Sequence, residues 1–172
     1  MRGIYTLIIR CSRPARIKVG RHLTLRLRRG WYLYSGSALG RGSTSLEWRI
    51  SRHLTQEKKH FWHIDRILSS DSTRVVSVIF AKTTSKMECK LNAALLKDPG
   101  IRVPGRWVGS TDCRCESHFL TTRDTLDVLR QKVRLCYTRL GLRPRTLECS
   151  RIAESAFQLI SRADRARNSS QN

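Results

Sequence analysis

Residues 3–10 read GIYTLIIR and residues 30–36 read GWYLYSG. Both stretches are rich in β-branched and aromatic side chains, which favour extended backbone. The first alternates two sets of apolar side chains and the second is bounded by glycines, so each is predicted to form a strand. If these strands are neighbours in one sheet, Tyr5 and Tyr34 can converge on the same face.

Further elements are predicted on the carboxyl side of each of these strands. Strands are expected at residues 16–19, 23–28 and 75–81, and helices from Ser43 or Thr44 to about Leu54, over 61–68, and from Thr84 or Ser85 through Leu95. Prolines and glycines between residues 99 and 105 predict a loop, and residues 107–120 have a polar, irregular pattern. This mixture predicts an α/β domain over residues 1–122.

The pattern changes after residue 122. Apolar residues recur at helical spacing from Leu126 to Leu140, and Gly141 is suited to end that helix. A second amphipathic helix is predicted from about Thr146. Residues 123–163 are therefore expected to form a helical extension, and residues 164–172 a disordered polar tail.

The charge of the chain indicates a polyanionic partner. Its 172 residues include 34 Lys and Arg, of which 26 are Arg, against 13 Asp and Glu, a net charge of +21. Such an excess opposes the compact state by self-repulsion and attracts nucleic acid. The longest apolar stretch, residues 75–81, is too short to cross a bilayer, and Arg10 and Arg13 interrupt any signal-peptide core. A cytoplasmic protein with no membrane partner is expected.

Five residues could together perform phosphodiester chemistry. Tyr5, Tyr34 and His53 offer groups for proton transfer, Arg49 a positive charge for phosphate, and Glu88 a carboxylate for a divalent cation. Taken singly, each has a structural explanation, because strand tyrosines pack in cores and helical Arg and Glu face solvent. Their combination is what favours a phosphodiesterase.

These residues resemble the motifs of the GIY-YIG nuclease superfamily, and the chain is most similar to a mainly archaeal, uncharacterised branch also found fused to endonuclease III-type repair enzymes. The resemblance covers about residues 2–122 and is specific because its motifs occur in order. They are Gly3-Ile4-Tyr5, Tyr34-Ser35-Gly36-Ser37-Ala38, Arg49-Ile50-Ser51-Arg52-His53, Trp62-His63-Ile64-Asp65, Glu88-Cys89 and the stretch from Gly109 to His118.

The resemblance implies a small central mixed or antiparallel sheet flanked by helices, and hydrolysis of DNA phosphodiester bonds with a single Mg²⁺ or Mn²⁺ ion. Tyr5, or a water activated beside it, would be the general base, and Tyr34 would orient or share that role. Arg49 would neutralise charge on the phosphorane, Glu88 would hold the ion, and His53 matches a histidine near the scissile phosphate.

The second motif departs from the family pattern, because Ser35 replaces the usual Ile or Val and the Asn that often closes the site has no clear match. The residues that could support the site instead are His63, Asp65, Ser110, Asp112 and His118.

Contacts to the DNA backbone are expected from basic residues outside the catalytic set, although a merely solvated basic face is the alternative. The candidates are Arg26, Arg28, Arg29, Arg52, Lys58 and Lys59. The four tryptophans are more typical of a core than of base-stacking platforms.

The sequence Asp112-Cys113-x-Cys115-x-x-His118 has three interpretations. It could bind zinc, with Cys89 as a distant fourth ligand. It could be a loop of buried thiols with a capping Asp, which is the interpretation that we favour, or it could act directly in catalysis.

The predicted function is a metal-dependent DNA endonuclease. Its interpretation as a repair enzyme for damaged, abasic or unusual-structure DNA follows from the repair enzymes to which relatives are fused. The alternatives are a non-catalytic nucleic-acid-binding module and a protein that cleaves or binds RNA. Cleavage that survives EDTA would instead indicate a lyase at abasic sites. Deleting residues 123–172 is expected to leave the chemistry on bound substrate intact.

Overall fold

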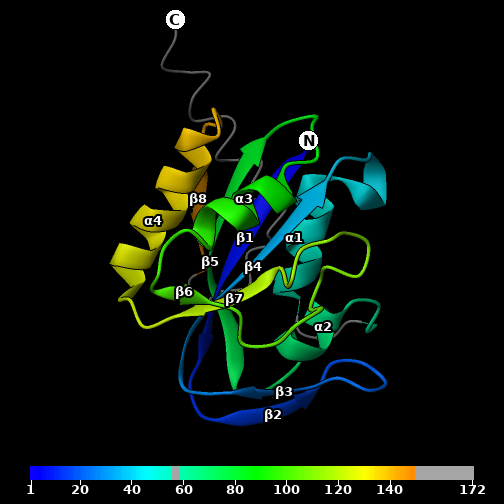
Figure 1. The fold of residues 1–172 in the computed structure, drawn as a ribbon. Coiled ribbons are helices and arrows are strands. Elements are labelled where there is room, and N and C mark those ends of the chain that lie inside the picture. The colour runs from blue at the N-terminus through cyan, green and yellow to red at the C-terminus, as the bar shows by residue number, and fades with distance from the viewer. Residues whose placement is uncertain (56–58, 150–172) are drawn as a thin grey trace, which may run out of the picture.

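A central six-stranded sheet organises the protein (Figure 1), whose computed structural model describes residues 1–55 and 59–149. The strand order is β6-β7-β4-β1-β5-β8, and each pairing among these described strands is antiparallel. The strands are β1 (Gly3–Cys11), β4 (Gly30–Ala38), β5 (Thr73–Lys82), β6 (Ile101–Arg102), β7 (Phe119–Thr122) and β8 (Arg145–Glu148). The predicted α/β class, with a central antiparallel sheet flanked by helices, is confirmed.

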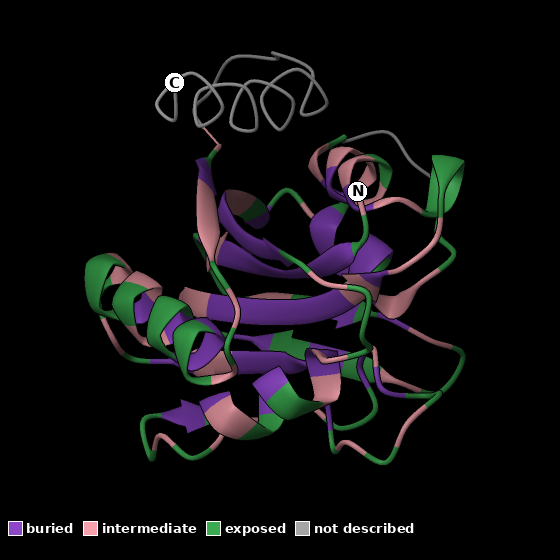
Figure 2. Ribbon diagram, turned by 90° about the horizontal axis from the view of Figure 1, so that it is seen from above, coloured by how far each residue is buried: buried purple, intermediate pink, exposed green. Residues whose placement is uncertain are grey.

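Helices cover both faces of this sheet. Helices α1 (Leu46–Leu54) and α2 (His63–Leu68) pack on one face, and α3 (Glu88–Leu95) and α4 (Leu126–Arg139) on the other. The buried strands and the exposed outer sides of the helices are visible in Figure 2. None of the described helices has the length and apolar character needed to cross a bilayer.

The alternation of side chains along β1 separates the two cores. Leu7 and Ile9 belong to the cluster under α1 and α2, whereas Ile4 and Ile8 belong to the cluster under α3 and α4. Because successive side chains of a strand point to opposite faces, a strand that buries apolar side chains on both faces must lie in the middle of a three-layer structure.

A second, two-stranded sheet extends the first of these cores. It consists of β2 (Ala15–Lys18) and β3 (Thr24–Leu27). Ile17, Leu25 and Leu27 pack into the cluster under α1 and α2, while the alternate residue Arg26 is exposed. The strands predicted over residues 16–19 and 23–28 therefore form a hairpin outside the central sheet.

The start of α1 follows the predicted pattern one residue later. The short helix η1 (Gly42–Thr44) precedes α1, and Ser45 is the N-cap of α1. The side-chain oxygen of Ser45 accepts a hydrogen bond of 3.3 Å from the backbone N–H of Trp48. A serine in this position satisfies one of the free amides of the first helical turn.

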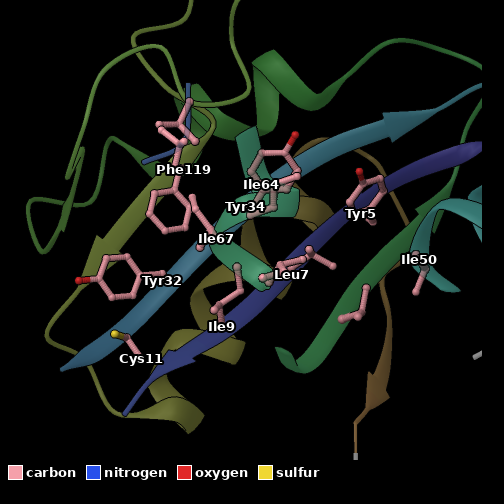
Figure 3. Close-up of a cluster of buried hydrophobic side chains, with 14 of the residues drawn as sticks. Tyr5, Leu7, Ile9, Cys11, Tyr32, Tyr34, Ile50, Ile64, Ile67 and Phe119 are labelled. Atoms are coloured by element: carbon pink, nitrogen blue, oxygen red, sulfur yellow. The ribbon is translucent and has the colours of Figure 1, made fainter. Parts of the chain in front are cut away.

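The pairing of β1 with β4 brings the two tyrosines together. Tyr5 is opposite Gly36 and Leu7 is opposite Tyr34, so both tyrosines point to the same face, two positions apart (Figure 3). A Cβ atom on Gly36 would lie 2.5 Å from the hydroxyl oxygen of Tyr5. Glycine at position 36 is therefore required for Tyr5 to lie flat across β4.

The described part of the predicted extension belongs to the central unit. Leu129 and Val133 of α4 are buried against the sheet, and the hydroxyl of Tyr137 donates to the carbonyl oxygen of Ile79 at 3.0 Å. Strand β8 pairs with β5. Residues 123–148 thus complete the core on one face of the sheet and add a strand at one edge. They are part of the same folded unit as residues 1–122 and not a separate extension.

Three short strands differ from the sequence-based expectation. The helix predicted from about Thr146 is wrong at its start, because Thr146 lies in β8 and pairs with Ile79. The remainder of that helix and the predicted tail of residues 164–172 lie outside the described residues. Strands β6 and β7 lie in segments interpreted as loops, and at two and four residues they are too short to show a periodic pattern.

We expect a chain ending after residue 122 to lose cooperative folding, because it would expose the apolar surface that α4 covers. A chain ending after residue 149 keeps all the described elements and is expected to show a cooperative thermal transition by circular dichroism. Cooperative unfolding of the shorter chain, with native-like secondary structure, would place a true domain boundary at residue 122.

Candidate functional site

A cleft of about 360 Å³ lies where the central sheet, three helices and two loops meet. The sheet contributes Tyr5 and Tyr34, α1 contributes Arg49, and the first residue of α3 is Glu88. Other lining residues are Ser35, Gly36, Ser37, Phe61, Trp62, His63, Gly109, Thr111, Asp112 and His118. Four of the five residues predicted to be catalytic therefore line a single cleft.

The two tyrosines form the buried floor of this cleft. Burial raises the pKa of Tyr5 well above its usual value near 10, and the neighbouring Tyr34 adds to this, while the positive charge of Arg49 opposes it. Burial likewise raises the pKa of Tyr34. Both phenols therefore carry their protons at neutral pH.

His53 lies behind Tyr5 rather than in the lining of the cleft. It is one helical turn after Arg49 on α1, and only 2% of its surface is exposed. Its Nε2 atom is 2.8 Å from the hydroxyl of Tyr5, and a neutral imidazole with its proton on Nδ1 would accept that hydrogen bond. His53 can therefore exchange a proton with the cleft through Tyr5.

Arg49 is held by an aromatic contact. Its guanidinium carbon lies 4.7 Å from the centre of the Trp62 ring, and its Nε has no hydrogen-bond partner among the described residues. Stacking on an indole orients a guanidinium without using its donors. The arrangement leaves Arg49 with hydrogen-bonding capacity for an anion in the cleft.

Glu88 presents a carboxylate suited to a divalent cation. Only 4% of the residue is exposed, and its Oε1 lies 3.6 Å from the ammonium of Lys86. Its Oε2 is buried without a hydrogen-bond partner among the described residues, which is costly for a charged group. Mg²⁺ and Mn²⁺ prefer oxygen ligands, so Glu88 fits the role of their protein ligand.

Asp65 and Arg52 have structural partners. Asp65 is fully buried and forms an ion pair of 2.5 Å with Arg52. Its Oδ2 also accepts hydrogen bonds of 3.0 Å from the backbone amides of Phe61 and Trp62. The pair therefore holds the segment that places Trp62 beside Arg49, and the Arg52 side chain does not extend freely into solvent.

Four of the other basic residues predicted to contact DNA lie outside the cleft. Arg26, Arg28 and Arg29 are exposed on β3 and immediately after it, and Lys59 is exposed before α2. Lys58 lies outside the described residues.

The predicted supporting residues divide between the cleft and its walls. His63 lines the cleft, and its Nδ1 lies 3.1 Å from the carbonyl oxygen of Trp107. Ser110 is fully buried, whereas the carboxylate of Asp112 is mostly exposed, 3.5 Å from Lys86. His118 is buried, and burial lowers the pKa of its imidazole, so it is neutral at neutral pH.

His118 also belongs to a group of residues that could hold a metal ion. The other members are Cys89, Cys113 and Cys115, and the four ligand atoms lie within 4.8 Å of one another. All three thiols are free, as are those of the other cysteines of the chain. Such a donor set is not typical of a magnesium or manganese site.

Several cleft residues were not predicted from the sequence. Trp62 was interpreted as a core residue, although it stands in the same motif as His63. Gly109 has a φ of 72°, and a Cβ there would lie 2.5 Å from Cε2 of Tyr34, so both conformation and space require glycine. The need for glycine at position 109 could not be predicted from the sequence, because it arises from a contact with Tyr34, which is far away in the chain.

Comparison with known proteins identifies a family without a described activity. The family model described as domain of unknown function DUF123 matches residues 4–141. No match was found among curated proteins or among solved structures.

We expect Asp65→Asn to destabilise the protein by about 3 kcal/mol, because it removes the buried negative charge that accepts hydrogen bonds from Arg52 and from the amides of Phe61 and Trp62. Urea unfolding of the variant beside the wild type measures this difference. The matched control is Glu116→Gln, which breaks an exposed ion pair with Arg106 and should cost less than about 1 kcal/mol. Equal losses in the two variants would contradict a structural role for Asp65.

Proposed function

We propose that this chain, which belongs to the DUF123 family, is a divalent-metal-dependent endonuclease that hydrolyses DNA phosphodiester bonds. The observation that carries the proposal is the convergence of Tyr5, Tyr34, Arg49 and Glu88 on one cleft, with His53 bonded to Tyr5. The resemblance of the motifs around these residues to GIY-YIG nucleases supports the same reaction.

In the proposed mechanism Tyr5 and His53 move protons as a pair. Because Tyr5 is protonated at rest, it can accept a proton from the attacking water only by giving up its own. The hydrogen bond of 2.8 Å to His53 Nε2 provides the acceptor for that proton. Tyr5 would thus act as the general base, and His53 would carry the positive charge that develops.

Arg49 and Glu88 have complementary electrostatic roles in this proposal. The guanidinium of Arg49 would donate to a non-bridging phosphate oxygen and stabilise the charge of the phosphorane. Glu88 would hold Mg²⁺ or Mn²⁺, which when bound supplies Lewis-acid stabilisation of the phosphate and leaving oxygens. Tyr34, beside both groups in the lining, would orient the phosphate.

The surface around the cleft supports a nucleic acid as substrate. The net charge of +21 favours a polyanion, and the side chain of Phe61, in the lining of the cleft, is 72% exposed. An exposed aromatic ring beside a phosphate site can stack on an unpaired base. This favours DNA with damaged, abasic or otherwise unpaired positions, and hence a role in repair.

The proposal is tested by incubating the full chain with labelled duplex, abasic and single-stranded DNA and with RNA. We expect cleavage of DNA with Mg²⁺ or Mn²⁺, loss of cleavage in EDTA, and recovery when Mg²⁺ is restored in excess. Tight binding without cleavage would instead support a binding module, preferential cutting of RNA would change the substrate, and EDTA-resistant cutting at abasic sites would indicate a lyase.

We expect Glu88→Gln to slow single-turnover cleavage on the order of a thousandfold, because the amide keeps the shape but not the charge that holds the cation. Binding to DNA should persist, since removing a negative charge does not weaken attraction to phosphate. Asp127→Asn, at the exposed start of α4, removes a carboxylate far from the cleft and should cleave at the wild-type rate. Full activity of Glu88→Gln would exclude Glu88 as the ligand.

We expect Tyr5→Phe to slow cleavage by roughly a hundredfold to ten-thousandfold, the range of general-base catalysis. If Tyr5 and His53 act as one relay, adding His53→Ala to that variant should slow cleavage little further. Tyr32→Phe is the control, because the Tyr32 hydroxyl bonds to the backbone of Arg28 and is not in the lining of the cleft. Additive losses in the double variant would contradict a relay.

A further inference from the structure

Four potential metal ligands converge beside the cleft from two separate segments. Cys89 is the second residue of α3, and the others come from the loop that precedes β7. The Nε2 atom of His118 is 3.7 Å from Sγ of Cys89 and 3.6 Å from Sγ of Cys113. With Cys115, these are the metal-binding cluster.

The spacing of the cluster matches a tetrahedral site. Zinc bonds of about 2.3 Å to sulfur and about 2.0 Å to nitrogen place the ligand atoms of a tetrahedron roughly 3.5–3.8 Å apart. The two distances to His118 lie in this range, and the whole set lies within 4.8 Å. Small side-chain movements would bring all four atoms onto one ion.

We propose that the metal-binding cluster holds one structural zinc ion that fastens the loop before β7 to the start of α3. Three thiolates and one imidazole form a donor set that selects zinc over the hard cations. Four protein ligands complete the tetrahedron and leave no position for a reacting water, which distinguishes a structural site from a catalytic one.

The zinc ion would add a tie to a loop that few backbone hydrogen bonds between described residues hold. In residues 103–118, Trp107 N–H donates to Glu116, Cys113 N–H to Ser110 and His118 N–H to Val108, and the carbonyl oxygen of His118 accepts from Ser35 N–H. Trp107 adopts a φ of 66°, a left-handed conformation that is unfavourable for a bulky residue. A tie between this loop and α3 comes from Asn92, whose side-chain amide donates to the carbonyl oxygen of Ser117 at 2.8 Å.

The zinc ion would also position Glu88. Cys89 follows Glu88 directly at the start of α3, and Gly109 of the same loop contacts the ring of Tyr34. An ion on Cys89 would therefore hold the carboxylate of Glu88 and one wall of the cleft in a fixed relation. The zinc site itself does not depend on the proposed nuclease function, because its occupancy is measured without substrate.

Metal content is the first test. We expect the full chain, purified under reducing conditions without chelator, to contain one zinc ion per chain, measured by inductively coupled plasma mass spectrometry. Cys113→Ser and Cys115→Ser should each lower that content at least tenfold. Cys136→Ser, which removes a thiol of α4, should keep one zinc per chain. Wild-type protein with reduced thiols and no metal, or with an iron–sulfur chromophore, would overturn the proposal.

The second test does not depend on how well the variants fold. Wild-type chain stripped of metal and titrated with Co²⁺ should develop sulfur-to-cobalt charge-transfer absorption and the visible bands of a tetrahedral site, with an endpoint at one ion. Zinc should abolish these bands and slow amide hydrogen exchange in residues 106–118 and at the start of α3. Octahedral cobalt spectra, or exchange that zinc does not change, would contradict the proposed site.

Discussion

The antiparallel register of β1 against β4 is the constraint on which the site depends. It places Tyr5 opposite Gly36 and two positions from Tyr34, so both phenols enter the same face. A shift of one residue would send Tyr5 to the opposite face, under α3 and α4. The register is secured by burial on both sides, because β1 contributes apolar side chains to both cores. The same pairing that stabilises the sheet therefore aligns the groups of the cleft.

Burial determines the electrostatics of the cleft floor. The phenols are removed from water and stay protonated, and in our proposal the hydrogen bond between Tyr5 and His53 carries the proton that Tyr5 gives up. The guanidinium of Arg49 is held by side chains behind it. Trp62 stacks on Arg49, and the buried Asp65 accepts a hydrogen bond from the backbone amide of Trp62. Asp65 thus contributes to the cleft by positioning an aromatic ring.

The start of α3 is where two kinds of metal chemistry would meet in our proposals. Glu88 presents a carboxylate to the cleft, whereas Cys89 turns towards the thiols and imidazole of the loop before β7. Oxygen ligands suit Mg²⁺ or Mn²⁺ and thiolates suit zinc, so adjacent residues can select different ions. A zinc ion bound to Cys89 would fix the start of α3 and so restrict the movement of Glu88, the proposed ligand of Mg²⁺ or Mn²⁺.

The motifs and reactive residue types of the sequence pointed to half of the residues that line the cleft. The sequence by itself also determined the long elements and the α/β class, because periodic apolar patterns and caps are local signals. Strands β1, β4 and β5 and helices α1 and α4 were predicted on that basis. Only the tertiary structure decided that β6, β7 and β8 are strands, since segments of two to four residues form strands only by pairing with a neighbour. It also decided that α4 completes the core, that Asp65 pairs with Arg52, and that Cys89 reaches Cys113. Each of these contacts joins residues that lie on different elements, and no local pattern records which distant residue will be the neighbour.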